Sequence, residues 1–357
     1  MAVGMAMAEA HLAAKFNKEG YPVVDHFTYV LGGDGCMMEG ITHEAFSLAG
    51  TLKLGKLIVL YDSNKITIEG STDIAFTEDV KARFAAYGFQ TITVENGNDI
   101  DAVAAAIAEA KADLTRPSMI EIKTQIGYGC PGKQGKASAH GEPLGDENIA
   151  EMKKNLNWPS EEAFFVPEEV YANYKAISEA KAADEEAWNK LFADYCAKFP
   201  EMKKAWDDEF NMDIAKPLID DADFWAYEDK PEATRNLSGM VINRLKDKVP
   251  GLVGGAADLH PSTKTYMKEA GDFSAEDYSG RNLHYGVREI AMTAIANGLT
   301  LHGLRGFCST FFVFSDYVKP MARLSSIMNI PTTYVLSHDS IGVGEDGPTH
   351  EPIEQLA

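Results

Sequence analysis

Short apolar runs alternate with amphipathic stretches along the first third of the chain. Four runs rich in apolar and β-branched residues predict strands, at 26–31, 56–61, 89–94 and 118–123. Stretches with apolar residues at helical spacing predict helices, at 1–17, 39–52, 79–87 and 99–113. Because strands that alternate with helices at this spacing build βαβ units, we expect a parallel sheet covered on both faces.

The same alternation returns near the end of the chain. Predicted strands lie at 251–255, 306–311 and 332–337, and predicted helices lie at 231–248, 286–302 and 315–328. The sequence therefore predicts an α/β domain over 1–145 and a second one over 231–357. A further helix is expected to begin near Pro352. Since the patterns at both ends read as interrupted elements, we expect the chain to be a segment of a longer protein.

The residues between these domains have a different pattern. Residues 146–230 are acidic and Lys-rich and lack strand signals, which predicts a helical connector with solvated charged faces and a long helix over 168–199. Just before it, 126–145 is rich in glycine and proline and carries His140. Long loops in compact domains are usually functional or disordered, so this loop is a candidate part of a binding site.

Charge and cysteine content narrow the classes of function. The chain has 54 acidic and 33 basic residues and a formal net charge of −21. Such an excess argues against nucleic acid and anionic membranes as partners, although a few local cations suffice to bind a phosphate. No apolar run is long enough to span a bilayer. The four cysteines are scattered without metal-binding spacing, which fits reduced thiols in a cytoplasmic protein.

Candidate chemistry follows the first two predicted strands. Gly33, Asp34 and Gly35 come directly after the first strand, and Asn64 and Ile66 follow the second. Glycines let the backbone turn and approach a ligand closely, and open α/β sheets bind ligands at the carboxyl ends of their strands. A turn with a capping Asp would explain Gly-Asp-Gly alone, whereas its pairing with Asn64 indicates a shared ligand.

The three groups at this position offer only oxygen. The carboxylate of Asp34, the amide oxygen of Asn64 and the carbonyl of Ile66 would form a hard ligand shell. That shell suits Mg²⁺ or Ca²⁺ carrying phosphates rather than zinc.

This spacing resembles the Mg²⁺–diphosphate motif of thiamine diphosphate enzymes, and the residues around Asp34 and Asn64 look like transketolase. The resemblance implies two thiamine diphosphate-binding-type parallel-sheet domains, diphosphate-binding and then pyrimidine-binding, both truncated and joined by the helical connector. It also implies thiamine diphosphate as cofactor, with Mg²⁺ (or Ca²⁺ or Mn²⁺ in its place) held by Asp34, Asn64 and Ile66. Gly33, Gly35 and Glu39 would lie beside this cofactor.

Two motifs of the second domain extend the resemblance to the pyrimidine ring. In His-Tyr-Gly-Val-Arg-Glu, Glu289 opens a helix, where an acid would also be favoured by the helix dipole. The matching family residue bonds to the aminopyrimidine and is catalytic. Phe311, Phe314 and Tyr317 recur every three residues, a stripe that alone would indicate core packing. In the family these three residues form the wall on which the pyrimidine stacks.

A third motif, from His338 to His350, follows the last predicted strand and contains Asp346. Its spacing matches no zinc pattern, and its glycines favour a loop shaped for a ligand. By resemblance, His338 and His350 bind sugar hydroxyls and phosphate as catalytic groups, and Asp346 binds a hydroxyl. His140 would be a further catalytic residue that faces both substrate and cofactor, since a histidine pKa lies near working pH.

Looser matches add further residues. Arg235 and Ser262 look like sugar-phosphate contacts, because a guanidinium forks well onto phosphate. A surface arginine and a helix-capping serine remain the alternatives. Asp258 would lie near the thiazolium ring. Glu39 and Glu44 either are solvated acids or belong to a carboxylate network that links two active sites.

The resemblance implies transfer of a two-carbon ketol unit between sugar phosphates in the pentose phosphate pathway, by a homodimer with the cofactor at the subunit interface. Family members begin before Met1 and continue past Ala357, so we expect this chain alone to have little activity. Alternative interpretations of the function are dihydroxyacetone synthase, deoxyxylulose phosphate synthase and a non-catalytic interaction module. His338 and the loop that ends at His350 favour transketolase.

Overall fold

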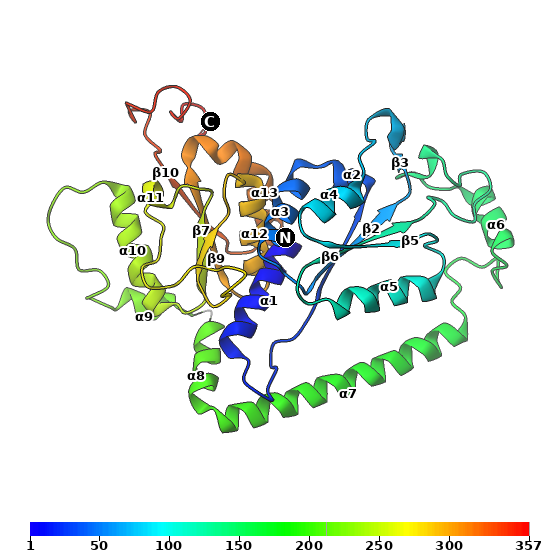
Figure 1. Cartoon of the computed structure of the whole chain (residues 1–357), viewed down its shortest axis with the longest axis horizontal. Coiled ribbons are helices and arrows are strands. Elements are labelled where there is room, and N and C mark those ends of the chain that lie inside the picture. Colours follow the sequence, from blue (N-terminus) through cyan, green and yellow to red (C-terminus); the bar gives the residue numbers. More distant parts are fainter. Residues whose placement is uncertain (212, 357) are drawn as a thin grey trace. The chain divides into compact units, whose positions relative to one another are not determined.

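A computed structural model describes residues 1–211 and 213–356 (Figure 1). The chain divides into two compact units. The first unit comprises Met1–Thr28, His43–Leu57 and the chain from Tyr195 onward, and the second comprises Tyr29–Thr42 and Ile58–Asp194. Each unit contains one four-stranded sheet, as the alternating pattern predicts.

The sheet of the second unit has the strand order β1-β2-β6-β5. Its strands are β1 (Thr28–Gly33), β2 (Leu57–Ser63), β5 (Gln90–Val94) and β6 (Ser118–Lys123). Strand β6 pairs in parallel with β2 on one side and β5 on the other, with Ile120 opposite both Leu60 and Ile92. Met119 and Ile120 are fully buried, so β6 is the centre of this core.

Helices cover both faces of this sheet. Figure 1 shows α4 (Val80–Ala86) and α5 (Ile100–Ala112) on either side of β5 and β6. Each helix is preceded by an aspartate whose side chain accepts a hydrogen bond from the backbone N–H three residues on, Asp79 from Ala82 N and Asp99 from Ala102 N. Such caps satisfy orphan N–H groups and fix where each helix starts.

The helix predicted over 39–52 is confirmed within one residue at each end, but a short helix that was not predicted precedes it. Helical structure starts at Asp34 with α2 (Asp34–Met38), stops at Glu39 and resumes as α3 (Gly40–Thr51). Glu39 has extended backbone angles (φ −64°, ψ 132°), which end α2 after little more than one turn. Asp34 therefore occupies the first helical position after β1.

After β2 the chain forms a hairpin of β3 (Ile66–Thr67) and β4 (Gly70–Ser71), followed by the 3₁₀ helix η1 (Thr72–Ile74). The predicted loop over 126–145 contains only the 3₁₀ helix η2 (Ala137–Ala139). The connector is helical as predicted, with α6 (Asp146–Asn155), the 31-residue α7 (Glu168–Lys198), α8 (Pro200–Glu209) and α9 (Ala215–Ile219).

The sheet of the first unit has the order β10-β9-β7-β8, and all its pairs are parallel. Its strands are β7 (Leu252–Ala256), β8 (Asn282–His284), β9 (Arg305–Phe311) and β10 (Thr333–Ser337). Strand β8 was not predicted, because three residues are too short for a periodic signal. The helices of the same part of the chain are α10 (Thr234–Lys248), α11 (His260–Thr263), α12 (Glu289–Leu301), η3 (Phe312–Phe314) and α13 (Ser315–Met328). The helix predicted near Pro352 is wrong, since 352–356 form only bends and turns.

The predicted domain boundaries, 1–145, 146–230 and 231–357, stay a prediction. Helix α1 (Ala2–Phe16) groups with the sheet of the first unit. The reason is a close crossing with the buried helix α12. A Cβ on Gly4 would lie 2.1 Å from the carbonyl oxygen of Ile295, and a Cβ on Gly298 would lie 2.2 Å from that of Met1. Glycine at both positions lets the two backbones touch.

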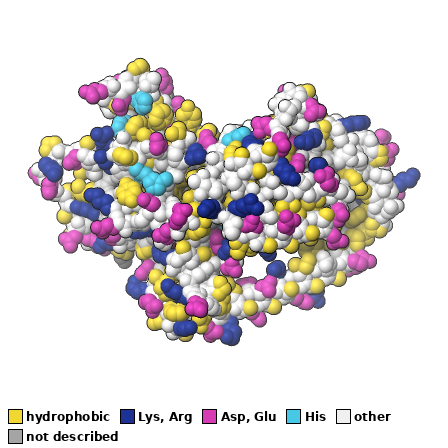
Figure 2. Space-filling view, in the orientation of Figure 1, with side chains coloured by type: hydrophobic (Ala, Val, Ile, Leu, Met, Phe, Trp, Pro, Cys, Tyr) yellow, Lys and Arg dark blue, Asp and Glu magenta, His cyan; other side chains and the backbone are white. Residues whose placement is uncertain are grey.

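No helix in the described part of the chain is long and apolar enough to cross a membrane. On the face seen in Figure 2, acidic and basic side chains are interspersed rather than gathered into one broad basic patch. The expectation that nucleic acid and membranes are not partners stays a prediction.

The crossing of α1 and α12 predicts the effect of two substitutions. Gly4→Ala and Gly298→Ala should each lower the free energy of unfolding by about 1–3 kcal/mol, because the new methyl group overlaps backbone atoms that cannot move freely. Gly40→Ala in α3 is the control, since its Cβ would meet no atom within 4 Å and alanine favours helix. Urea unfolding measures all three. Equal stability of the Gly4 variant and the control would contradict this packing.

Candidate active site

The buried carboxylate of Asp34 is the centre of the second unit's polar site. Its side chain is 2% exposed and accepts three hydrogen bonds. The Tyr61 hydroxyl donates to Oδ1 at 2.6 Å, and the backbone N–H groups of Asn64 and Lys65 donate to Oδ2 at 3.1 and 2.9 Å. Burial, and then the nearby Asp34, raise the pKa of Tyr61, so this phenol stays a donor. Asp34 thereby joins the end of β1 to the turn after β2.

The turn at Asn64 is itself fixed. The Asn64 side-chain oxygen accepts from Ile66 N at 2.9 Å, and Lys65 has a left-handed backbone (φ 63°). Asp62, which precedes the turn, accepts a short hydrogen bond from the Thr124 hydroxyl. Asp34, Asn64 and Ile66, separated by some thirty residues in sequence, therefore lie side by side at the carboxyl ends of two strands.

The donor set at this turn fits a hard divalent cation. It offers one buried carboxylate, one amide oxygen and a backbone carbonyl, the oxygen ligands that Mg²⁺ accepts while keeping waters and phosphate oxygens in its remaining positions. Within 1–211 and 213–356, no group of three or more His, Cys, Asp or Glu side chains is arranged to hold a metal ion. Zinc-type ligation is thus not offered by the described residues.

The glycines beside Asp34 act differently from the sequence expectation. Gly33 has an ordinary extended backbone (φ −98°, ψ −174°), so no left-handed turn is needed there. A Cβ on Gly35 would meet no atom within 4 Å, so Gly35 leaves the space next to Asp34 open. Glu39 and His140 are exposed, and among the described residues neither has a hydrogen bond to Asp34 or Asn64.

In the first unit, Glu289 occupies the first position of α12 and is half-buried. Burial, and to a smaller extent the neighbouring Glu44, raise the pKa of Glu289 above its ordinary value. Glu44 accepts a hydrogen bond from Ala291 N at 2.9 Å and so caps the same helix. Two carboxylates from α3 and α12 therefore share one helix end, and Glu289 is biased toward its protonated form.

Three aromatic side chains line the end of β9. Phe311 is buried, and its ring is nearly parallel to that of Phe314 with centroids 6.1 Å apart. Tyr317 is 52% exposed and lies 6.5 Å from Phe314. The three residues form a continuous aromatic surface of which only part is core, as a ring-stacking platform requires.

Both histidines of the last motif contact this platform. The centroids of the His338 and Phe311 rings lie 3.9 Å apart, and those of the His350 and Phe314 rings lie 5.6 Å apart. Arg235, from the first turn of α10, reaches His338 Nε2 with a guanidinium nitrogen at 2.9 Å. Burial and this arginine lower the pKa of His338. The structure thus brings together five residues from three separate motifs.

Other predicted residues are placed less closely. Asp258 follows β7 with a left-handed backbone (φ 62°) and lines a cavity of about 490 Å³. Ser262 lies in α11 and has a backbone hydrogen bond to Leu259. Asp346 is exposed, and its charge raises the pKa of His338, against the effect of Arg235. Among the described residues, no hydrogen bond joins Ser262 or Asp346 to the histidines.

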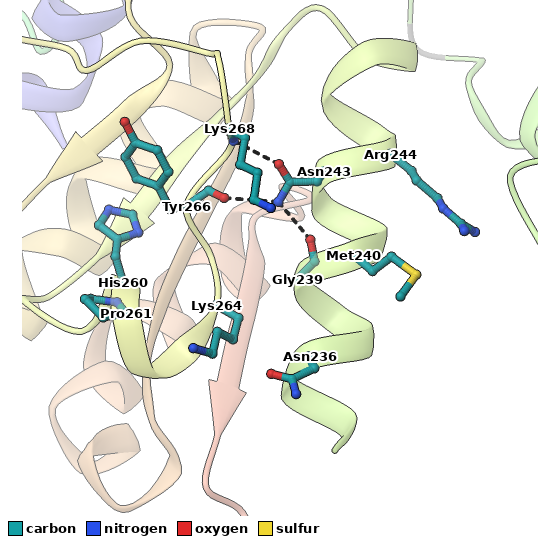
Figure 3. A pocket seen from close by; sticks show the side chains of 10 residues that line it. All are labelled: Asn236, Gly239, Met240, Asn243, Arg244, His260, Pro261, Lys264, Tyr266 and Lys268. Carbon is teal, nitrogen blue, oxygen red and sulfur yellow. Dashed lines mark hydrogen bonds between the residues drawn. The ribbon is translucent and has the colours of Figure 1, made fainter. Parts of the chain in front are cut away.

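A second cavity, of about 570 Å³, lies between α10 and the segment 260–268 (Figure 3). Figure 3 shows Asn243 bonded to Gly239 O, Tyr266 O and Lys268 N, which fixes this segment on the helix. The cavity contains none of the predicted site residues, although Arg235 and Ser262 adjoin its lining in sequence. We therefore assign it no part in the site.

Sequence reasoning missed three functional candidates. Tyr61 reads as an apolar strand residue, and nothing in the pattern reveals its bond to Asp34. Ser337 ends β10 and contacts His338 Nδ1 at 3.0 Å. His284 pairs with Asp272 at 2.9 Å and lines the cavity beside Asp258. Only His284 had a signal, because it belongs to the motif that contains Glu289.

Two family models match the chain. The model described as "Transketolase, thiamine diphosphate binding domain" matches residues 1–214, and "Transketolase, pyrimidine binding domain" matches residues 230–357. Among curated proteins, the chain is 52% identical to the transketolase of Halalkalibacterium halodurans and 50% identical to that of Bacillus subtilis. Each match covers 100% of this chain and 54% of the relative.

Solved structures give the same result. The transketolase from Leishmania mexicana superposes with a TM-score of 0.93 at 43% identity, over 99% of this chain and 53% of that one. The transketolase from Campylobacter jejuni gives a TM-score of 0.90 at 39% identity. The chain thus spans about half the length of the relatives that it matches. With both family models covering nearly all of its residues, the chain belongs to the transketolase family.

Proposed function

We propose that this chain takes part in thiamine diphosphate-dependent ketol transfer. A two-carbon ketol unit would move from a ketose phosphate of the xylulose 5-phosphate type to an aldose phosphate of the ribose 5-phosphate type, a reaction of the pentose phosphate pathway. The observation that carries this proposal is the buried Asp34 carboxylate, held against the turn at Asn64. Family membership supplies the reaction class.

In this proposal Asp34, Asn64 and the Ile66 carbonyl hold Mg²⁺, for which Ca²⁺ or Mn²⁺ can substitute. The ion carries the diphosphate, and Gly33, Gly35 and Glu39 border it. The support is the oxygen-only donor set and the open space beside Gly35. Asp34 needs no rearrangement to act, because its position is already fixed by three hydrogen bonds.

Bound thiamine diphosphate supplies a nucleophilic thiazolium carbon. Glu289 would hold a proton against the pyrimidine ring nitrogen, and its raised pKa favours the protonated carboxyl that this hydrogen bond requires. Phe311, Phe314 and Tyr317 would stack on the ring and exclude water from one face. Asp258 would lie near the thiazolium.

Substrate contacts are proposed for the polar residues around this platform. Arg235 and Ser262 would bind the sugar phosphate, His338 and His350 its hydroxyls and phosphate, and Asp346 a hydroxyl. His140 would move a proton. The support is the cluster of Arg235, His338 and His350 on the aromatic surface. A cationic group beside two imidazoles suits a phosphorylated sugar.

We further propose a cytoplasmic homodimer in which the diphosphate-binding domain of one subunit faces the pyrimidine-binding domain of the other. The resemblance to transketolase supports this arrangement, and the four free cysteines suit a reducing compartment.

A chimera tests the function. This chain replaces the matching half of the Bacillus subtilis transketolase, and ketol transfer from xylulose 5-phosphate to ribose 5-phosphate is measured. We expect the chimera to be active and the isolated chain to show little turnover. A folded chimera without transfer would refute the proposal, and transfer to formaldehyde alone would indicate dihydroxyacetone synthase chemistry instead.

Asp34→Asn in this chimera should weaken Mg²⁺-dependent binding of thiamine diphosphate by more than about 100-fold, the upper range for loss of an outer-shell partner. The charge that attracts the cation is removed while the shape is kept. Isothermal titration with cofactor and Mg²⁺ measures the change. Glu69→Gln, an exposed acid in the adjoining hairpin, is the control and should bind normally. Unchanged affinity in the Asp34 variant would rule out this metal site.

Glu289→Gln in the same chimera should lower turnover by about 10²–10⁴-fold, the range for loss of a positioned proton-transfer group. The fold should be no less stable at neutral pH. Burial raises the pKa of Glu289, so the ionised carboxylate is disfavoured in the folded chain above that pKa, and glutamine removes this cost. Steady-state kinetics and thermal unfolding are compared with Glu276→Gln, an exposed acid of the same unit. Wild-type turnover in Glu289→Gln would show that Glu289 is only an acidic residue at the start of a helix.

A further inference from the structure

Both ring nitrogens of His338 are occupied. Arg235 lies at 2.9 Å from Nε2, and the Ser337 hydroxyl lies at 3.0 Å from Nδ1. The ring is held against Phe311, and the left-handed backbone of His338 (φ 57°) turns it back over the end of β10. The ring therefore has one orientation with a defined partner on each side.

These partners determine which nitrogen carries the proton. An arginine guanidinium can only donate, so Nε2 must be the acceptor. A neutral imidazole then carries its proton on Nδ1, and the Ser337 hydroxyl must accept it. Arg235 is exposed and can exchange its bond for water, whereas Ser337 is only 8% exposed. Ser337 is thus the partner that water replaces least easily.

We propose that Ser337 is a positioning residue that accepts the Nδ1–H of His338 and holds the ring in place, so that Arg235 and His338 capture a phosphate monoester together with one proton. This inference rests on the proposed binding of sugar phosphates at this cluster. It assigns a role to Ser337, which lies outside the predicted site, and it adds the uptake of one proton to phosphate binding.

The proton movement follows from the bonds. An incoming phosphate dianion accepts the N–H of Arg235, which leaves Nε2 without its donor. A proton from solvent then binds to Nε2, and the new Nε2–H donates to a phosphate oxygen. The Nδ1–H keeps its hydrogen bond to the Ser337 hydroxyl throughout, so the ring does not flip and keeps a partner on each side. Charge-assisted bonds of this kind are the strong ones in anion recognition.

The charged groups around the ring set the direction of the pH dependence. Burial, then Arg235 of α10, lower the pKa of His338, and His350 lowers it slightly. Asp346 and Asp339 of the following loop act in the opposite direction. A bound dianion raises the pKa of His338. Between the free and the bound pKa, binding takes up a proton, so affinity rises as pH falls through this window until the phosphate itself protonates, near its second pKa of about 6.

The test uses the intact chain with ¹⁵N-labelled histidine. Long-range ¹H–¹⁵N spectra separate protonated from unprotonated ring nitrogens, and a His338→Asn variant identifies the His338 signals. The spectra are recorded against pH with and without saturating ribose 5-phosphate, and neutral ribose serves as the ligand control. We expect protonated Nδ1 in the free chain, and a pKa of His338 that rises when ribose 5-phosphate binds.

Three variants separate positioning from stability. Ser337→Ala leaves the Nδ1–H of His338 without its acceptor and should flatten the pH dependence of ribose 5-phosphate binding, which in the wild type reaches at most about tenfold per pH unit for one proton. Ser337→Thr keeps the hydroxyl and should behave as wild type. Ser309→Ala is the matched control: Ser309 is buried, lies opposite Val335 in the adjacent strand and bonds to the Val335 carbonyl, not to His338.

Each outcome decides the proposal. Flattened pH dependence in Ser337→Ala, with normal behaviour of Ser337→Thr and Ser309→Ala, supports it. An Nε2–H tautomer in the free chain, or binding of ribose 5-phosphate without a rise in the pKa of His338, overturns it while sugar-phosphate binding stands. If ribose 5-phosphate does not bind to the wild type at all, both this inference and the proposed substrate contacts fail.

Discussion

The buried carboxylate of Asp34 is the interaction on which the diphosphate side of the protein depends. An ionised group removed from water is costly unless its hydrogen bonds are replaced, and here a phenol and two backbone amides replace them. In meeting that requirement, Asp34 fixes the turn at Asn64 and Lys65 at the end of the neighbouring strand. The same three bonds that make the charge tolerable therefore also assemble the proposed metal site.

The pyrimidine side is built on a simpler geometric rule. In a parallel sheet all strands end at the same edge, and this is where α/β proteins bind ligands. Asp258 follows β7, His284 ends β8, Phe311 ends β9 and His338 follows β10. The edge of this one sheet thus collects an acid, two histidines and an aromatic ring from segments far apart in sequence. Glu289 opens the helix α12, which packs against β9 of the same sheet.

Sequence patterns predicted the long regular elements well and the short ones poorly. The 31-residue α7 and the strand β6 have enough residues to show a period, whereas β8 and α11 have three and four. The pairing of Asp34 with Asn64 was predicted from their places after two adjacent strands, whereas Arg235 and His338 were assigned to one site only through resemblance to a family. The bonds of Tyr61 and Ser337 could not be predicted, because they depend on which hydroxyl the fold places beside a charged or titratable group.

Asp34, Asn64 and Ile66 are proposed to hold a magnesium ion and its diphosphate together. A titration of the ¹⁵N-labelled chain with Mg²⁺ and thiamine diphosphate tests this site, because amide shifts report weak binding residue by residue. We expect the Asn64 side-chain amide and the backbone amides of Lys65 and Ile66 to shift when both ligands are present, and not to shift in Asp34→Asn. Shifts confined to other residues, or the same shifts in both proteins, would contradict it.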